Sequence, residues 1–212
     1  MKTKVFNLVI LDESGSMESI KASAISNVNE TFQTIRNAQT NHEDQEHFVT
    51  FVTFDSEAIN TIYDCAPVST IHEINDNIYR PNACTPLYDA MGFSITNLRS
   101  KVSESDKILV TIVTDGLENA SKEYNGRAIK KLVEEMKENG WVFVYMGANH
   151  DVESFAEHIS INNYRRFEAT DAGVYACLSA ERDARTRYYD RISDAKSSPA
   201  DINEDFDFFK EY

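Results

Sequence analysis

The chain has 212 residues, of which 42% are hydrophobic and 26% are charged. This length and this balance are typical of one folded domain with a sizeable core, and they exclude a chain that is disordered throughout. The formal net charge of −14 argues against nucleic acid and anionic membranes as partners, because binding to either relies on clustered Lys and Arg.

The first part of the chain alternates predicted strands with a long helix. Residues 5–11 form a nearly continuous apolar run, which predicts a central strand buried on both faces. A helix follows, because apolar residues recur at spacings of three and four, namely at Ile20, Ala24, Val28, Phe32 and Ile35. Residues 47–54 and 58–63 predict two more strands, and the short turn between them requires an antiparallel pair.

The second part of the chain continues this alternation. It predicts a helix that begins at Thr85, strands over residues 107–114, 141–146 and 164–167, and helices over residues 128–137, 152–158 and 172–192. Strands that alternate with helices imply an α/β fold, in which helices cover both faces of a mostly parallel central sheet. We predict one domain over residues 1–192 and an acidic, aromatic C-terminal tail over residues 193–212.

Hydrophobicity and cysteine usage indicate the compartment. No apolar run reaches the roughly 18 residues that a membrane span needs. The first residues lead into only a short apolar stretch before Asp12, so we expect no signal peptide. The cysteines Cys65, Cys84 and Cys177 are widely spaced and odd in number, which is typical of free thiols in a reducing compartment. The predicted localisation is cytoplasmic.

Five polar side chains are placed where a sheet of this kind binds its ligands. Asp12, Ser14 and Ser16 follow the first predicted strand, Thr85 precedes a helix, and Asp115 follows the strand over residues 107–114. Loops that follow the carboxyl ends of parallel strands share one rim of the sheet. The five side chains can therefore converge, although the two groups of loops lie about a hundred residues apart in the sequence.

The chemistry of this set favours a hard cation. All five side chains offer oxygen, and none offers sulfur or imidazole. Two carboxylates and three hydroxyls suit Mg²⁺ or Mn²⁺ with one coordination position left open, whereas Ca²⁺ prefers more oxygens and more carboxylates. The Asp or Glu carboxylate of a partner protein can fill the open position.

Simpler readings of the same residues stay open. Ser14 and Ser16 can serve only to cap the following helix, and Asp115 can serve only in a turn. Glu13, Glu18, Glu118 and Asn119 are expected near the same rim, either as part of a solvated face or as side chains that support the site.

The spacing of these residues resembles the motif of a known family. Asp12-x-Ser14-x-Ser16, Thr85 and Thr114-Asp115-Gly116 resemble the metal-ion-dependent adhesion site (MIDAS) of von Willebrand factor type A (vWA) domains, and the resemblance covers roughly residues 3–192. It implies a Rossmann-like, doubly wound sheet with one antiparallel edge strand. It also implies that the two serines bind the metal directly, that Thr85 does so in a high-affinity state, and that Asp12 and Asp115 act directly or through water.

One departure from the family concerns the loop before the threonine. This loop is often rich in glycine in vWA domains, but here it reads Pro81-Asn82-Ala83-Cys84-Thr85. Fewer glycines predict a stiffer loop, which bears on how far Thr85 can move between two states.

The predicted function is a metal-dependent protein–protein interaction module. Intracellular, bacterial-type vWA proteins are often adaptor or assembly subunits, and this chain resembles them. We expect no enzymatic activity. The first alternative is a metal-dependent phosphoryl-transfer or hydrolytic enzyme, although Ser14 stands where a phosphatase of the haloacid dehalogenase type has a second Asp. A Walker loop is also missing from the sequence. The second alternative is a structural subunit that works without metal.

The C-terminal tail over residues 193–212 has three possible roles. It can be a docking peptide for a partner. It can supply a carboxylate to the open metal position of a neighbouring molecule, which would be self-association through the tail. It can also pack on its own domain or stay disordered.

Overall fold

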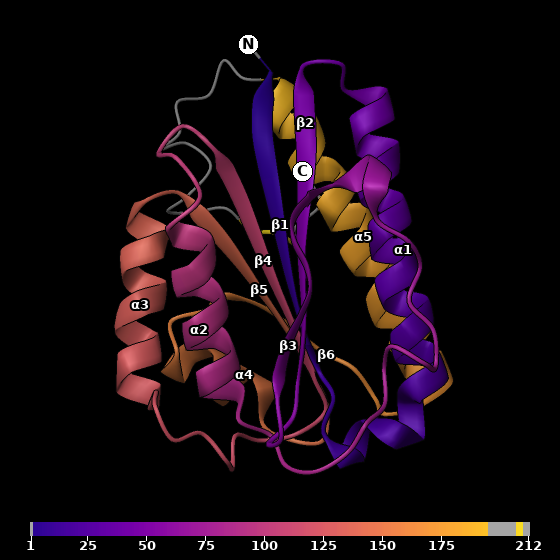
Figure 1. Cartoon of the computed structure of the whole chain (residues 1–212), viewed down its shortest axis with the longest axis vertical. Coiled ribbons are helices and arrows are strands. Elements are labelled where there is room, and N and C mark those ends of the chain that lie inside the picture. Colours follow the sequence, from indigo (N-terminus) through magenta and orange to yellow (C-terminus); the bar gives the residue numbers. More distant parts are fainter. Residues whose placement is uncertain (1, 195–206, 210–212) are drawn as a thin grey trace.

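The computed structural model describes residues 2–194 and 207–209 and contains one six-stranded sheet (Figure 1). The strands are β1 (Thr3–Asp12), β2 (Gln45–Phe54), β3 (Ile59–Pro67), β4 (Lys107–Thr114), β5 (Trp141–Gly147) and β6 (Asn163–Arg166). They are arranged in the order β3-β2-β1-β4-β5-β6. Every neighbouring pair is parallel except β2 and β3, which are antiparallel. The predicted α/β class and the antiparallel edge strand are confirmed.

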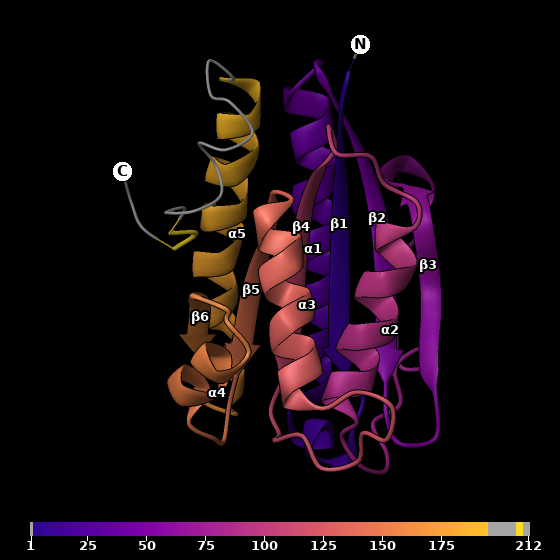
Figure 2. The same cartoon turned by 90° about the vertical axis from the view of Figure 1, so that its left-hand side faces the viewer.

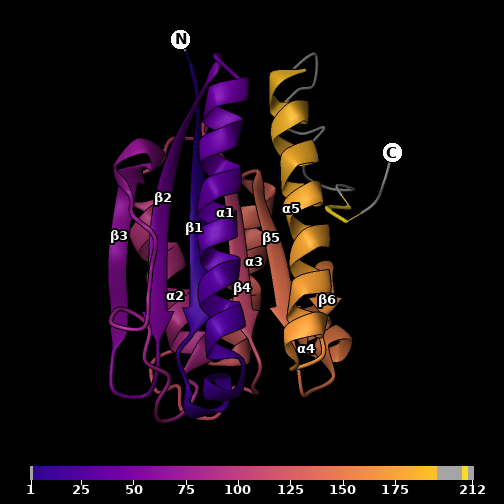
Figure 3. The same cartoon turned by 90° about the vertical axis from the view of Figure 1, so that its right-hand side faces the viewer.

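Helices cover both faces of the sheet, as predicted (Figures 2 and 3). One face carries α1 (Lys21–Asn41) and α5 (Asp171–Ser193), and the other carries α2 (Leu87–Arg99), α3 (Gly126–Glu138) and α4 (Val152–His158). The central strand β1 sends Val5, Val9 and Leu11 into the first core and Phe6, Leu8 and Ile10 into the second. This double burial explains its nearly continuous apolar sequence.

Helix α2 starts later than predicted, and two short 3₁₀ helices were not predicted. A short 3₁₀ helix, η1 (Gly15–Ile20), precedes α1, and a second one, η2 (Val68–Thr70), follows β3. Helix α2 begins at Leu87 and not at Thr85. The reason is Pro86, because the residue before a proline is disfavoured in the helical region. Thr85 therefore belongs to a loop, which leaves its hydroxyl free to face the rim.

A buried ion pair joins α5 to the centre of the sheet. Arg185 and Glu181 are 0% and 2% exposed, and the Arg185 Nε atom lies 2.8 Å from Glu181 Oε1. The guanidinium also donates to Thr111 Oγ1 on β4 at 2.7 Å and to Asn7 Oδ1 on β1 at 3.3 Å. A third bond reaches the hydroxyl of Tyr189 at 3.1 Å. The guanidinium is thus surrounded by acceptors from three elements.

Part of the predicted C-terminal tail packs on the domain. The backbone N–H of Phe208 donates to Asn163 Oδ1 on β6 at 2.8 Å, and the Phe208 side chain is 1% exposed. Its ring lies 6.4 Å from that of Tyr188 on α5, and Arg165 lies over the ring of Phe209 at 5.5 Å. Residues 195–206 and 210–212 lie outside the described residues, and the domain boundary near residue 193 stays a prediction.

Two observations bear on the compartment. Within the described residues, no helix is both long enough and apolar enough to cross a membrane. The three cysteines, Cys65, Cys84 and Cys177, are free thiols, as predicted.

Candidate metal centre

The central strand pair brings the two acidic loops together. β1 and β4 are parallel neighbours, and Leu11 pairs with Val113 next to the ends of both strands. Asp12 is the last residue of β1, and Asp115 directly follows β4. Both carboxylates are buried, at 0% and 2% exposure. The convergence at one rim of the sheet that the sequence predicts is therefore present in the structure.

The serine loop folds back onto the second carboxylate. Ser16 Oγ donates to Asp115 Oδ1 at 2.5 Å, although the two residues are 99 positions apart. Ser16 Oγ also lies 3.2 Å from Ser14 Oγ. The backbone N–H of Ser14 donates to Asp12 Oδ1 at 2.7 Å, which holds the loop in this shape. Four of the five predicted residues are thus joined by hydrogen bonds, of which the one between Ser14 and Asp12 uses the Ser14 backbone.

The fifth side chain, Thr85, reaches the same place from across the rim. A Cβ atom at Gly116 would lie 3.5 Å from Thr85 Oγ1 and 3.6 Å from Ser16 Oγ. The missing side chain at Gly116 therefore leaves room between these hydroxyls. We call the side-chain oxygens of Asp12, Ser14, Ser16, Thr85 and Asp115 the oxygen ring.

The oxygen ring contains one buried acceptor that lacks a donor. Asp115 Oδ2 is buried and has no hydrogen-bond partner in the part of the chain that the structure describes. Burial raises the pKa of Asp115 above its ordinary value, and it raises the pKa of Asp12 to about 6. Both shifts have burial as their largest cause, because charged carboxylates lose solvation there. A cation would favour the charged forms, so the ring has the chemistry of a site for Mg²⁺ or Mn²⁺.

The described residues contain no metal centre built from carboxylate, thiolate and imidazole ligands alone. They contain no group of three or more His, Cys, Asp or Glu side chains that could hold an ion. Any metal bound at this rim would therefore depend on the hydroxyl groups as well as on the two carboxylates.

Comparison with solved structures identifies the fold. The PilB minor pilin from Streptococcus sanguinis has a TM-score of 0.63 at 12% identity, over 91% of this chain and 64% of that one. The von Willebrand factor type A protein from Catenulispora acidiphila has a TM-score of 0.58 at 11% identity, over 87% and 43%. The SpRpn10 VWA domain has a TM-score of 0.52 at 10% identity, over 83% and 94%. The chain has a vWA-like fold.

These similarities show the fold alone, because the sequence identities are only 10–12%. No protein family model matches the chain, and no curated protein matches it significantly. The chain spans less than two thirds of the length of the minor pilin. The vWA-like fold accounts for the sheet and its helices, and it says nothing about a metal.

Three further residues support the oxygen ring, and of these only Tyr79 was not expected near the rim. Thr114 Oγ1 donates to Asp12 Oδ2 at 2.5 Å, and the Tyr79 hydroxyl donates to the backbone oxygen of Asp12 at 2.6 Å. Glu13 Oε1 accepts from the N–H of Arg80 at 2.5 Å. Thr114 was visible as part of the Thr-Asp-Gly motif. Tyr79 lies in a stretch without apolar periodicity, so the sequence carries no signal for its 0% exposure.

The loop before Thr85 is held on both sides, by the serine loop and by the β2–β3 turn. The N–H of Gly15 donates to Ala83 O at 3.1 Å, and the N–H of Cys84 donates to Ser56 Oγ on the β2–β3 turn at 3.1 Å. Ala83 has a φ of 59°, an uncommon conformation for a residue with a side chain. The contacts fix the backbone that leads into Thr85.

The segment after β4, residues 116–124, is fastened to the first turn of α2, and we call it the strap. Glu118 Oε2 accepts from the N–H of Tyr88 at 2.9 Å, and the Ser121 hydroxyl accepts from the N–H of Asp89 at 3.0 Å. The Asp89 carboxylate accepts in turn from three backbone N–H groups of the strap, those of Lys122, Glu123 and Tyr124. Glu118, for which the sequence left open a solvated or a supporting role, thus supports the structure beside the site.

Gly92 on α2 lies directly under the strap. A Cβ atom there would be 2.5 Å from ring atoms of Tyr124. We expect Gly92→Ala to lower the free energy of unfolding by about 1–3 kcal/mol, measured by chemical denaturation, because the aromatic ring of Tyr124 has to move. In a Tyr124→Ala background the same change should stabilise by about 0.5–1 kcal/mol, since alanine is the better helix former. An equal loss in both backgrounds would contradict this packing.

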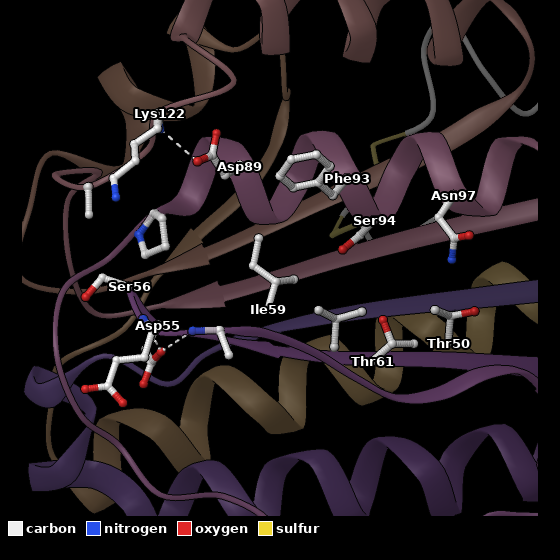
Figure 4. A pocket seen from close by; sticks show the side chains of 15 residues that line it. Thr50, Asp55, Ser56, Ile59, Thr61, Asp89, Phe93, Ser94, Asn97 and Lys122 are labelled. Atoms are coloured by element: carbon white, nitrogen blue, oxygen red, sulfur yellow. Dashed lines mark hydrogen bonds between the residues drawn. The ribbon is translucent and has the colours of Figure 1, made fainter.

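A groove runs beside the rim between the β2–β3 hairpin and α2 (Figure 4). Its volume is ≈ 460 Å³, and its walls include Ile59 on β3 and Phe93 on α2, whose side chain is 46% exposed. Pro86 lines its end next to Thr85. None of the five residues of the oxygen ring lines this groove, so the candidate metal site lies outside it.

Proposed function

We propose that this chain is a protein–protein interaction module that holds Mg²⁺ or Mn²⁺ in the oxygen ring and binds a partner through it. One observation carries the proposal, which is the buried Asp115 Oδ2 atom without a hydrogen-bond donor. Burying a carboxylate oxygen that nothing satisfies costs free energy. A cation next to it removes that cost.

The residues of the ring suit such an ion. The hydroxyl oxygens of Ser14, Ser16 and Thr85 and the carboxylates of Asp12 and Asp115 would hold it. Ca²⁺ is less suited, because it prefers more carboxylate oxygens than the ring offers. When bound, the ion supplies a charge of +2, which the carboxylates of Asp12 and Asp115 offset in the formal count.

The partner in this proposal contributes an Asp or Glu carboxylate to the open coordination position. Ser16 and Leu117 are among the exposed residues of the loops that carry the oxygen ring, and Leu117 is 54% exposed. A partner segment that carries an acid for the metal would therefore meet an apolar side chain directly beside it. This favours a protein partner over a small free anion, because the apolar contact adds area that an anion does not have.

The wider assignment is part of the same proposal. It gives the chain a binding role without catalysis, as an adaptor or assembly subunit in the cytoplasm, where the three free thiols are stable. Several neighbours with a vWA-like fold are named pilins or pilus adhesins, and one is a VWA domain of Rpn10. Self-association through the tail stays a prediction, and its described part, residues 207–209, packs on its own domain.

Calorimetric titration tests the proposal. Protein stripped with a chelator is titrated with Mg²⁺ and with Mn²⁺, with and without excess acetate as a stand-in for the partner's carboxylate, beside Asp12→Ala. We expect one ion per chain, tighter binding with acetate, and no binding in the variant. No binding in any of these conditions would overturn the metal site and leave the metal-independent structural subunit as the better reading.

A further inference from the structure

Thr85 lies in a different loop from the other four residues of the oxygen ring, and its backbone is hydrogen-bonded to Asn119. Thr85 is 3% exposed, whereas Asn119 is an exposed residue of the strap. We infer that Asn119 is a positioning residue, which fixes the Thr85 hydroxyl against Asp115 in the metal site. This inference rests on the proposed function.

Two reciprocal hydrogen bonds carry it. The backbone N–H of Thr85 donates to Asn119 Oδ1 at 2.9 Å, and the backbone N–H of Asn119 donates to Thr85 O at 3.1 Å. Both polar groups of the Thr85 backbone are therefore taken by one residue. With the N–H and the carbonyl fixed, the Cα–Cβ direction of Thr85 is fixed as well.

Asn119 is itself rigidly placed. It lies in the strap, between Glu118, which accepts from the N–H of Tyr88, and Ser121, which accepts from the N–H of Asp89. The strap starts at Gly116, directly after Asp115. Thr85 and Asp115 are thus joined through a short, fastened segment, although they come from different parts of the chain.

The consequence is a site that is formed before the ion arrives. Ligands that are held by surrounding hydrogen bonds lose little freedom on binding, and such support is worth about 10–100-fold in metal affinity. Asn119 is polar and neutral, so it orients Thr85 without adding charge to the ring. Movement of Thr85 relative to Asp115 would require both bonds to Asn119 to break.

A double-mutant cycle on Mn²⁺ affinity tests this role. Asn119→Leu has a similar shape and no acceptor, and we expect it to weaken Mn²⁺ binding by about 10–100-fold. In a Thr85→Ala background the same change should cost less than about 3-fold, because the hydroxyl that it positions is already gone. Asn119→Asp keeps an acceptor for the Thr85 N–H and should bind Mn²⁺ at least as tightly as the wild type.

Amide hydrogen exchange of metal-free protein gives a readout without the ion. The N–H of Thr85 should be protected in the wild type and in Asn119→Asp, and should exchange faster in Asn119→Leu. Equal losses of affinity in both backgrounds, or unchanged exchange in Asn119→Leu, would overturn the inference. Failure of the proposed function looks different, since Asp115→Ala would then bind Mn²⁺ as the wild type does.

Discussion

Replacing Arg185 with methionine is expected to lower the free energy of unfolding by about 3–5 kcal/mol, measured by chemical denaturation. The reason is the carboxylate that it leaves behind. Glu181 is 2% exposed and pairs with the guanidinium, so the variant keeps a buried charge without its partner. Thr111 and Asn7 lose a donor in the same step. Changing Glu181 to leucine as well should recover part of the loss, because the unpaired charge disappears.

Arg182 provides the matched control on the same helix. Its side chain is 44% exposed, and it pairs with Asp183, which is 58% exposed. Exposed ion pairs contribute about 0–1 kcal/mol, so Arg182→Met should leave stability nearly unchanged. If Arg185→Met cost no more than Arg182→Met, the buried network would not hold α5 to the sheet.

Replacing Asp115 with alanine is expected to abolish the stabilisation that metal gives, while the fold survives. At a metal concentration of 100 times the dissociation constant, the wild type should gain about 2.7 kcal/mol in unfolding free energy. The variant should gain nothing at that concentration, since it lacks the oxygen that has no other partner. Without metal the variant should be as stable as the wild type or more so, because a poorly satisfied buried carboxylate is gone. Thermal unfolding with and without Mn²⁺ measures both effects.

Glu18→Gln is the control for charge alone. Glu18 is an exposed acid in η1, next to the serine loop, and it is not part of the oxygen ring. Its replacement removes one negative charge near the site and should change the metal-dependent gain by less than about 0.5 kcal/mol. A full gain in Asp115→Ala, or a lost gain in Glu18→Gln, would show that the ring does not bind the ion.

Much of the fold was predictable because local patterns and global packing agree in this chain. β1 and β4 are buried on both faces, and such strands are recognised by unbroken apolar runs. The rim position of Asp12 and Asp115 follows from where those strands end. A helix boundary was predicted wrongly where a single proline sets the start of the helix. Pro86 moves the start of α2 beyond Thr85.

Residues such as Glu118 and Asn119 could be expected near the rim, but the contacts by which they support the site could not be predicted, since these join distant segments. Tyr79 donates to the backbone of Asp12 from a stretch without periodicity, and Asn119 bonds to the backbone of Thr85 rather than to its hydroxyl. Hydrogen bonds between a side chain and the backbone of a distant segment leave no pattern in a single sequence. The motif thus indicates which residues form the ring, whereas the tertiary structure decides how firmly they are held.

The pairing of β1 with β4 also has a consequence for the folding pathway. Ser16 and Asp115, which are 99 positions apart, come within hydrogen-bond distance only when these two parallel strands are side by side. Closing so long a loop costs conformational entropy before the stabilising contacts form, and pairing of strands that are distant in the sequence is therefore slow. No partly folded form without the central strand pair can contain the oxygen ring. The oxygen ring therefore cannot form before β1 and β4 have paired, and its integrity reports that this central strand pair has assembled.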